Sequence, residues 1–580
     1  MNRRSVVSLS LLVTGGVLVL FAALVSNANY HQALLTNTSR SLQWGPTLFR
    51  ILLAVHGFAL IVAGMIGRRT NQKPGLSQDS GSQNPSGLKI DKQALLILAV
   101  LTIVALVLRM FRLNTDLWFD EILMVLDFIR HPFGEMLTSF PSKNQHLLYS
   151  ILAHLSAQWF GESAWAVRLP SVIFGVASVW ALFLVGRHVF DRRVALFSST
   201  LLTLSYHHIW FSQNARGYMG LMLFTTLATW LWLEAWGRGL GWWIAYGVVA
   251  AIGAWVHMTM IFVVAAHGLL YLVWLVAPKL LGARRLAGKQ RWYPFVAWAL
   301  CGTLTLQVYA LALPEFFQTG IHEVSEPSEW VSLWWLVKES LRSLQFGFSA
   351  VIVLLAGGVM VGVGVWGLLR RDLMALCSMI LPPVFAGVTT LLWSHNFWPR
   401  LFFFAMGFGL LIAVNGAMKL PELLRWFVSA ERISDRQLAT VGTVLAVLMI
   451  TVSTATIPRC YALPKQNYTG AREFVESNRH NGDAVVAVGL AGVAYAKYFA
   501  PDWAAAQTQA ELDAVRQGRS DVWLVYTIPI QVKAYRPDVW RVIEKDFEVV
   551  KVFPGTLGGG EVFVCRQKNI VTVQLSGKVQ

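Results

Sequence analysis

The sequence has few charged residues for its length, and this scarcity limits the folds open to it. Only 14% of its 580 residues are Asp, Glu, Lys or Arg, whereas 55% are hydrophobic. The mean hydropathy is +0.53. Soluble domains carry about 25% charged residues. The composition therefore excludes an ordinary soluble protein and predicts a chain that crosses a membrane many times.

Acidic residues are the scarcer of the two charged classes, with 31 Asp and Glu against 48 Lys and Arg. A net charge of +17 could suggest nucleic-acid binding. The basic residues, however, fall in short clusters between apolar runs, as is typical of cytoplasmic loops. We therefore predict no nucleic-acid partner.

Cysteine is also scarce, with four in the whole chain. Cys301 and Cys377 fall inside apolar runs and lack the spacing of a metal site. Cys460 and Cys565 bracket the C-terminal segment, and they could form a disulfide if that segment lies in an oxidising compartment. The glycine run at 558–560 does not open a helix as a phosphate-binding loop would, so it predicts a turn.

Long apolar runs dominate the rest of the chain. A run of about 20 residues is needed to cross a hydrocarbon core of about 30 Å, and about thirteen runs approach this length. They lie near residues 6–26, 47–67, 94–111, 166–187, 194–210, 215–236, 242–260, 261–281, 293–313, 349–370, 373–393, 400–418 and 437–457. The sequence therefore predicts an α-helical polytopic protein of the cell (inner) membrane with about thirteen transmembrane helices.

The basic clusters fix an orientation for these helices. With a cytoplasmic N-terminus every cytoplasmic turn is basic, and an odd number of spans places the C-terminus outside. We divide the chain into a transmembrane hairpin (1–70), a cytoplasmic linker (71–93), a main bundle (94–457) and an extracytoplasmic domain (458–580). Ser26 to Ala28 could also be a signal-cleavage site, which would remove one helix without inverting the remainder.

The segment after residue 458 has the pattern of a small α/β domain. Apolar strands are predicted at Ala484–Val488 and Val522–Thr527, with helices between them and a hairpin at the end of the chain. Two amphipathic stretches in the long outside loops, His146–Phe160 and Ser328–Phe346, predict helices along the membrane surface.

One loop carries the strongest indication of chemistry. In the sequence LWFDE, which follows the apolar run that ends at Phe111, Asp120 and Glu121 are adjacent and lie where a membrane helix must surface. A carboxylate there can serve as a base for a lipid-borne substrate. Arg168, Arg216 and Arg400 lie at outside helix ends, against the positive-inside bias. An arginine of this kind taken alone is more often a snorkelling or salt-bridged structural residue than a ligand. Together with the acids they predict an anion site, because a guanidinium can donate two parallel hydrogen bonds to a phosphate.

Other polar residues face the same predicted side of the membrane and could bind sugar hydroxyls or phosphate. They are Lys143, Asn144, Gln145 and His146, Gln213 and Asn214, and His395 and Asn396. A lone histidine near a helix start is more often simply hydrogen-bonded than a metal ligand. We predict no certain cofactor and no assigned metal ligands. A divalent metal stays an alternative, although Asp116, Asp120 and Glu121 are the only compact acidic group.

Five motifs in order resemble a known family. LWFDE, KNQHLLYSIL, AVRLPSVIFG, HHIWFSQNARGYM and NFWPRLFFFAMG resemble segments of bacterial relatives of the protein O-mannosyltransferases and of the lipid A aminoarabinose transferase. These enzymes are similar to glycosyltransferase family 39 and have the GT-C fold. The resemblance covers about residues 94–420. It implies a polyprenyl-phosphate-linked sugar donor, an acceptor lipid, protein or glycan, and transfer at the outer face, usually with inversion.

The resemblance also implies residue roles. It assigns catalysis to Asp120, with Glu121 orienting substrate or assisting. It assigns substrate contacts to His146, Arg168, Arg216, Tyr218 and Arg400. The sequence departs from the family at two places: Gln145 precedes His146 with no proline after it, and Asn214 stands where relatives often carry Glu.

Two other functions stay open from the sequence. A transporter or flippase of lipid-linked sugars would use the same arginines, but such proteins usually carry ionisable groups near the middle of the membrane. His267 is the main candidate for such a group. A catalytically silent binding protein is the other alternative, which the departure at Asn214 keeps open.

Overall fold

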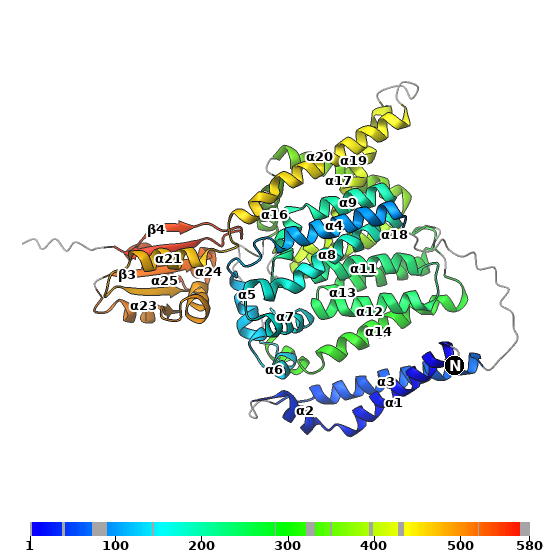
Figure 1. The fold of residues 1–580 in the computed structure, drawn as a ribbon, viewed down its shortest axis with the longest axis horizontal. Helices are drawn as coiled ribbons and strands as arrows, with labels where there is room; N and C mark the ends of the chain where they lie inside the picture. Colours follow the sequence, from blue (N-terminus) through cyan, green and yellow to red (C-terminus); the bar gives the residue numbers. More distant parts are fainter. Residues whose placement is uncertain are drawn as a thin grey trace, which may run out of the picture.

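The computed structural model describes most of the 580 residues of the chain. The described residues are 3–36, 41–71, 90–141, 144–282, 284, 286–320, 330, 332–348, 351–393, 398–426, 434–519 and 521–568. They form a helical bundle with a smaller α/β domain at one end (Figure 1).

The bundle is built from helices of very different length. The helices before the main bundle are α1 (Arg3–Leu24), α2 (Asn27–Leu34) and α3 (Gly45–Asn71). The bundle continues with α4 (Lys92–Met110), α5 (Phe119–Met124), η1 (Val125–Ile129), α6 (Phe133–Thr138), α7 (Leu147–Phe160), α8 (Ala164–Val189), α9 (Arg192–Thr203), α10 (Tyr206–Ser212), α11 (Tyr218–Ala235), α12 (Leu240–Val256) and α13 (Met260–Val276). It ends with η2 (Gly288–Trp292), α14 (Tyr293–Tyr309), α15 (Leu313–Glu315), η3 (Phe316–Gly320), α16 (Leu333–Phe348), α17 (Val351–Arg371), α18 (Leu373–Leu392), η4 (Pro399–Ala405), α19 (Met406–Lys419), η5 (Leu420–Trp426) and α20 (Asp435–Ala462).

Eight segments of the described chain are long and apolar enough to cross a membrane. Two shorter apolar helices, α12 and α13, accompany them. The predicted class of α-helical membrane protein is therefore confirmed, while the count of about thirteen spans stays a prediction. Both predicted surface segments are helical, as α7 and α16.

The predicted span at 194–210 is wrong as a single helix, because the chain breaks between α9 and α10. Leu204 and Ser205 separate the two helices. The buried guanidinium of Arg109 donates to the carbonyl oxygens of Leu202 and Thr203, at 3.3 to 3.5 Å. These carbonyls have no partner within α9, so a cation at this helix end stabilises the break. Arg109 also contacts His208 of α10 at 2.5 Å.

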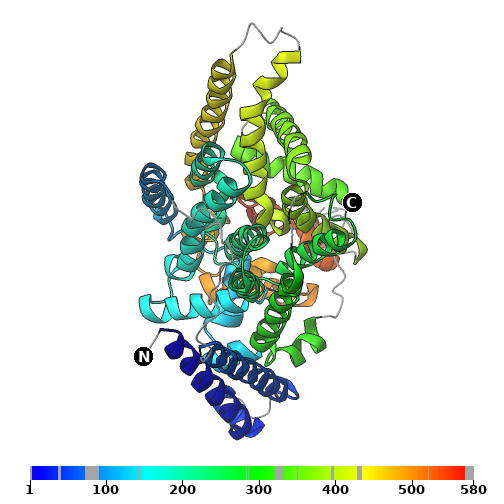
Figure 2. The same ribbon diagram turned by 90° about the vertical axis from the view of Figure 1, so that its right-hand side faces the viewer.

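The N-terminal hairpin lies at one margin of the bundle (Figure 2). α1 packs closely on α3 through facing glycines: a Cβ on Gly15 would lie 2.5 Å from the carbonyl oxygen of Gly57. Small residues permit such close approach of two membrane helices. Gln307 of α14 donates to the carbonyl of Phe49 at 3.1 Å, which joins the hairpin to the main bundle.

The C-terminal domain contains a five-stranded sheet in the order β2-β1-β3-β5-β4. β1 pairs in parallel with β2 and β3, and β5 pairs antiparallel to β3 and β4. Its elements are α21 (Tyr468–Asn478), β1 (Ala484–Val488), α22 (Leu490–Ala494), η7 (Tyr495–Phe499), β2 (Ala504–Ala506), α23 (Gln509–Arg516), β3 (Val522–Thr527), α24 (Pro529–Tyr535), α25 (Pro537–Asp546), β4 (Phe547–Phe553) and β5 (Val562–Gln567). The predicted strands, C-terminal hairpin and α/β class are confirmed, whereas the short β2 was not predicted.

The suggested disulfide is wrong. Cys460 and Cys565 are both buried free thiols. Cys460 packs with Tyr206 and Ile209 of the bundle, whereas Cys565 lies in the core of the sheet domain.

The sheet domain stands on the end of the bundle that carries α5 (Figure 1). The side chain of Gln466 links the two parts. It accepts a hydrogen bond from the backbone N–H of Phe119 at 2.8 Å and donates to Thr527, the last residue of β3, at 3.0 Å.

Candidate functional site

The loop before α5 is shaped by Glu121. Glu121 lies in the first turn of the helix, and its carboxylate accepts a hydrogen bond from the N–H of Trp118 at 3.2 Å. A carboxylate at this position stabilises the otherwise unpaired N–H groups of a helix start. The motif WFDE therefore begins a helix and turns its two adjacent acids toward different partners.

Glu121 is completely buried and joins several segments of the site through hydrogen bonds. It accepts hydrogen bonds from Arg168 at 2.5 and 2.8 Å and from the N–H of Ala215 at 2.6 Å. Arg168 is 1% exposed and also donates to the carbonyls of Leu113, Thr115 and Asp116. The structure thus brings Glu121 and Arg168 together as a fully bonded pair.

Lys465, which follows α20, is the third charge of this network. Its ammonium lies 3.8 Å from Glu121, donates to the carbonyl of Gln213 and lies 5.0 Å from the ring centre of Trp210. Burial lowers the pKa of Lys465 to about 7, although Glu121 raises it. Burial also raises the pKa of Glu121, but the charges of Arg168 and Lys465 and the hydrogen bonds outweigh this and hold it below its ordinary value.

Asp120 has a different environment from its neighbour. Its Oδ2 lies 3.3 Å from Arg400 and 4.0 Å from Arg216. This oxygen is buried and accepts no hydrogen bond from the described residues. The side chain of Asp120 thus lies between two guanidinium groups, with one oxygen that accepts no hydrogen bond from the described residues.

The two arginines are oriented by aromatic and amide groups. Arg400 begins η4 and lies over the rings of Trp398 and Trp118, at 4.6 and 5.5 Å from their centres. Arg216 donates to Asn144 at 2.9 Å. The Nε atoms of both arginines are buried without a hydrogen-bond partner among the described residues. Each guanidinium therefore keeps one N–H that no described residue binds.

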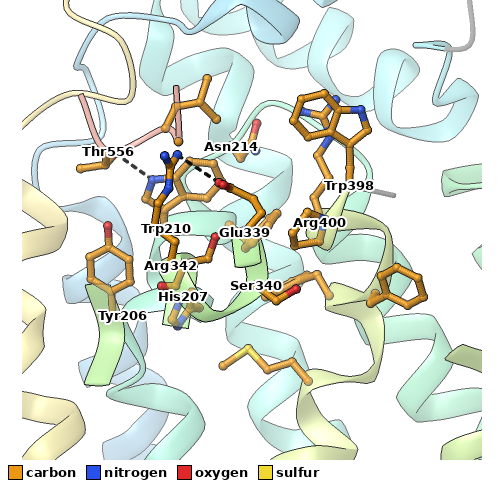
Figure 3. A pocket seen from close by; sticks show the side chains of 18 of the residues that line it. Tyr206, His207, Trp210, Asn214, Glu339, Ser340, Arg342, Trp398, Arg400 and Thr556 are labelled. Carbon is orange, nitrogen blue, oxygen red and sulfur yellow. Dashed lines mark hydrogen bonds and ion pairs between the residues drawn. The ribbon is translucent and has the colours of Figure 1, made fainter. Parts of the chain in front are cut away.

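A cavity of about 430 Å³ opens beside these groups (Figure 3). Arg400, Trp398, Trp118 and Asn214 form its polar end, and it continues along α19 as far as Leu410. Half of the remaining lining residues are aromatic or aliphatic, and the others include the charged Glu339 and Arg342 of α16. They come from α10, α16, η4, α19 and the loop before β5: Tyr206, His207, Trp210, Phe211, Glu339, Ser340, Arg342, Ser343, Pro399, Phe402, Phe403, Met406, Gly409, Thr556, Leu557 and Gly558. Such a cavity suits a ligand with an anionic head and a long apolar tail.

His146 lies near Arg216 and Arg400, in a cluster of aromatic rings. Its ring centre is 4.6 Å from that of His257 and 5.8 Å from that of Tyr218. Burial, together with the charge of Arg216, lowers the pKa of His146 well below its ordinary value, so the ring is neutral at pH 7. Its Nε2 has no partner among the described residues. Gly217 permits the packing, since a Cβ there would lie 3.1 Å from the imidazole.

The predicted amide residues divide between the site and its support. Asn214 lines the cavity, accepts a hydrogen bond from the indole of Trp118 at 3.0 Å, and keeps its Nδ2 unpaired within the described chain. Gln213 instead donates to the carbonyls of Arg109 and Phe111, at 3.0 and 2.7 Å. Its side chain therefore joins α10 to the end of α4.

Sequence reasoning missed the contribution of residues 465–469 to the site. Besides Lys465 and Gln466, Thr469 donates to Asp116 from both its N–H and its hydroxyl, at 2.8 and 2.7 Å. From the sequence, these residues are assigned only to the extracytoplasmic domain of residues 458–580, with no role in the site. The signal that the sequence offered was Lys465 and Gln466, two polar residues shortly after the last apolar run.

The acids of this loop do not form a shared set of metal ligands. Asp116 binds Thr469, Asp120 faces Arg400 and Glu121 pairs with Arg168. Within the described ranges no group of three or more His, Cys, Asp or Glu side chains is placed to hold a metal ion. His395, a predicted substrate-binding residue, lies outside the described residues, as do Asn396 and Lys143.

Fold and site together define a polytopic membrane protein with a cluster of two carboxylates and three guanidinium groups at one end of its bundle. Residues 144–309 match the family described as dolichyl-phosphate-mannose-protein mannosyltransferase. This match confirms the predicted resemblance over that segment, which contains His146, Arg168 and Arg216. Asp120 and Arg400 lie outside the matched residues. No curated protein matches the chain.

Three solved structures are distantly similar in overall form. An oligosaccharyltransferase from Archaeoglobus fulgidus is 12% identical, with a TM-score of 0.45 over 81% of this chain and 74% of that one. ArnT from Cupriavidus metallidurans, bound to undecaprenyl phosphate, is 11% identical, with a TM-score of 0.45 over 82% and 98%. The arabinosyltransferase EmbB from Mycobacterium smegmatis is 14% identical, with a TM-score of 0.42 over 72% and 45%.

Proposed function

We propose that this protein is a membrane glycosyltransferase that moves a sugar from a polyprenyl-phosphate-linked donor to an acceptor hydroxyl or amine, with inversion. One observation carries the proposal: an oxygen of Asp120 that accepts no hydrogen bond from the described residues lies 3.3 Å from Arg400, and Arg400 in turn lines an apolar cavity of about 430 Å³. The family match over residues 144–309 supports the reaction class.

Asp120 has the properties of a general base. Its free Oδ2 can accept the proton of the acceptor as the acceptor oxygen or nitrogen forms a bond to the anomeric carbon. The bond between this carbon and the phosphate oxygen breaks at the same time, and polyprenyl phosphate leaves with the electron pair. A positioned base contributes about 10²- to 10⁴-fold in rate.

Arg400 and Arg216 can stabilise the leaving phosphate. Its negative charge grows as the bond to the sugar breaks, so fixed guanidinium groups stabilise the transition state more than the ground state. Arg400 lines the cavity directly, and we assign it the first contact with phosphate. Since Arg168 is fully bonded to Glu121 and to backbone carbonyls, we assign this pair to positioning the loop.

The apolar lining of the cavity fits a lipid-linked donor. A polyprenyl chain anchored in the bilayer brings its phosphate only to the membrane interface, and the apolar lining between Phe403 and Leu410 continues from that level along α19. We place His146, Asn214 and Tyr218 at the sugar. With the predicted cytoplasmic N-terminus, the reaction takes place on the outer face of the inner membrane.

The test is an Asp120→Asn variant of the full chain in membrane vesicles. Transfer of a labelled sugar from polyprenyl phosphate should fall about 10²- to 10⁴-fold, while binding of polyprenyl phosphate persists. Unchanged transfer would exclude Asp120 as the base. Sugar-lipid translocation without transfer, in both wild type and variant, would instead identify a flippase. Mass spectrometry of envelope glycans with and without the protein would identify the sugar.

A further inference from the structure

A second cavity lies at the far end of the bundle from Asp120. It has a volume of about 520 Å³ and lies where α13, α17 and α18 meet. We call it the basic cleft, and its lining is Lys279, Leu280, Leu281, Gly282, Arg284, Leu369, Arg370, Arg371, Asp372 and Leu373. Four of these residues are cationic and one is acidic.

The single acid of the basic cleft is already neutralised. Asp372 forms a two-point ion pair with Arg284, with both oxygens at 2.7 Å. It also accepts a hydrogen bond from the N–H of Ala375 at 3.0 Å, which caps the start of α18. Asp372 therefore serves the fold, and Arg284 is held as a wall of the cleft.

Three cations of the basic cleft have no acidic partner. Arg370 lies 4.1 Å from the ring centre of Trp366, and Arg371 donates to the carbonyl of Phe190 at 3.4 Å. No carboxylate of the described chain lies within ion-pair distance of Lys279, Arg370 or Arg371. Three like charges around one cavity repel each other, and an anion bound there would relieve this repulsion.

The rim of the basic cleft is apolar as well as cationic. Leu280 is 59% exposed and Leu369 is 46% exposed, and both adjoin the cations. A soluble anion would gain nothing from these side chains. A phosphate joined to acyl chains would contact both, because the headgroup meets the cations while the chains cover the leucines.

The position of the basic cleft agrees with a membrane surface. α18 has 20 residues and runs from the basic cleft toward η4, which carries Arg400. A helix of this length spans about 30 Å, the thickness of a hydrocarbon core. The basic cleft therefore lies at the opposite membrane face from Asp120, on the side that the charge pattern predicts to be cytoplasmic.

We infer that the basic cleft binds the phosphate headgroup of an anionic phospholipid. Basic pockets between membrane helices on the cytoplasmic side suit this chemistry. The lipid would join the ends of α17 and α18, which are linked by a single residue between Arg371 and Leu373. This site is independent of the proposed sugar transfer.

The test compares two variants of the full chain that lose the same charge. The cleft variant is Lys279→Gln/Arg370→Gln/Arg371→Gln, and the control is Lys92→Gln/Arg193→Gln/Arg436→Gln, whose residues are exposed at the same end. Native mass spectrometry after titration with phosphatidylglycerol should show at least about tenfold weaker binding in the cleft variant, since each cation near the surface favours an anionic lipid. The control should bind as the wild type does.

Three results would overturn the inference. They are equal weakening in both variants, equal binding of phosphatidylcholine and phosphatidylglycerol by the wild type, and displacement of the lipid by millimolar inorganic phosphate, which would indicate a free anion as ligand. If the triple variant does not fold, Arg370→Gln alone serves, because it removes one cation and its contact with the ring of Trp366 and breaks no ion pair within the described structure. A wild-type affinity in that variant would equally count against the site.

Discussion

Replacing each of the two adjacent carboxylates by its amide should affect different properties of the protein, the activity in one case and the stability in the other. Asp120→Asn removes a charge that lies between Arg400 and Arg216 and that accepts no hydrogen bond on its Oδ2. We expect sugar transfer to be lost and the folded protein to be retained. Glu121→Gln removes a charge that is completely buried and accepts hydrogen bonds from Arg168 and Ala215. We expect the protein itself to become unstable.

The size of the second effect follows from the burial of Arg168. This side chain is 1% exposed, and in Glu121→Gln it keeps its charge without a counterion. Removing one partner of a buried pair costs about 3 to 5 kcal/mol, whereas replacing both by apolar residues is often neutral. The double variant Glu121→Leu/Arg168→Met should therefore recover part of the stability lost by Glu121→Gln.

Thermal unfolding in detergent, followed by tryptophan fluorescence, measures the stability, and transfer of a labelled sugar measures the activity. Glu121→Gln should lower the unfolding temperature clearly below that of Asp120→Asn. Equal unfolding temperatures for the two single variants would refute the assignment of Glu121 to positioning. A stable but inactive Glu121→Gln would instead make Glu121 a second catalytic carboxylate.

Three further predictions concern the surroundings of Asp120. Arg400→Lys keeps the charge but loses the planar fork, and it should weaken polyprenyl phosphate binding about 10- to 100-fold, measured by lipid titration. Gln466→Leu removes the bond to the N–H of Phe119 and should lower kcat about tenfold with KM nearly constant; a changed KM alone would contradict this. Lys465 has a pKa of about 7, so its charge is lost as the pH rises through 7, and activity should fall there in the wild type but not in Lys465→Arg. The free energy of unfolding should instead rise with pH between 7 and 10.5. In that range the unfolded chain, with a lysine pKa near 10.5, binds more protons than the folded chain does.

The class of membrane protein and the presence of a small C-terminal α/β domain could be predicted from composition and periodicity alone. Apolar runs and basic clusters each extend over many residues, so one misassigned residue does not change the predicted class. The break between α9 and α10 could not be predicted in this way, because it depends on Arg109, which reaches across from α4. An arginine at the end of an apolar run was visible in the sequence, but its partners, 93 to 94 residues away, were not.

Part of the candidate site could also be predicted from the sequence. The motifs LWFDE, RLPS, ARGYM and NFWPRL contain the charged residues, and the structure brings Asp120, Arg216 and Arg400 together. Sequence could not separate Arg168 from the other two, because burial and carbonyl contacts, not residue type, decide which arginine keeps free donors. It also missed Lys465, which lies 344 positions after Glu121 in the chain (465 minus 121).

The bonds from Gln466 to Phe119 and from Thr469 to Asp116 span 347 and 353 residues. The ribosome therefore makes the acidic loop early but its hydrogen-bonding partners only after nearly every membrane helix has been synthesised. Until α20 is inserted and the following segment has reached the same side, the loop lacks these contacts. The acidic loop of a nascent chain thus acquires its full set of contacts only when biogenesis is nearly finished.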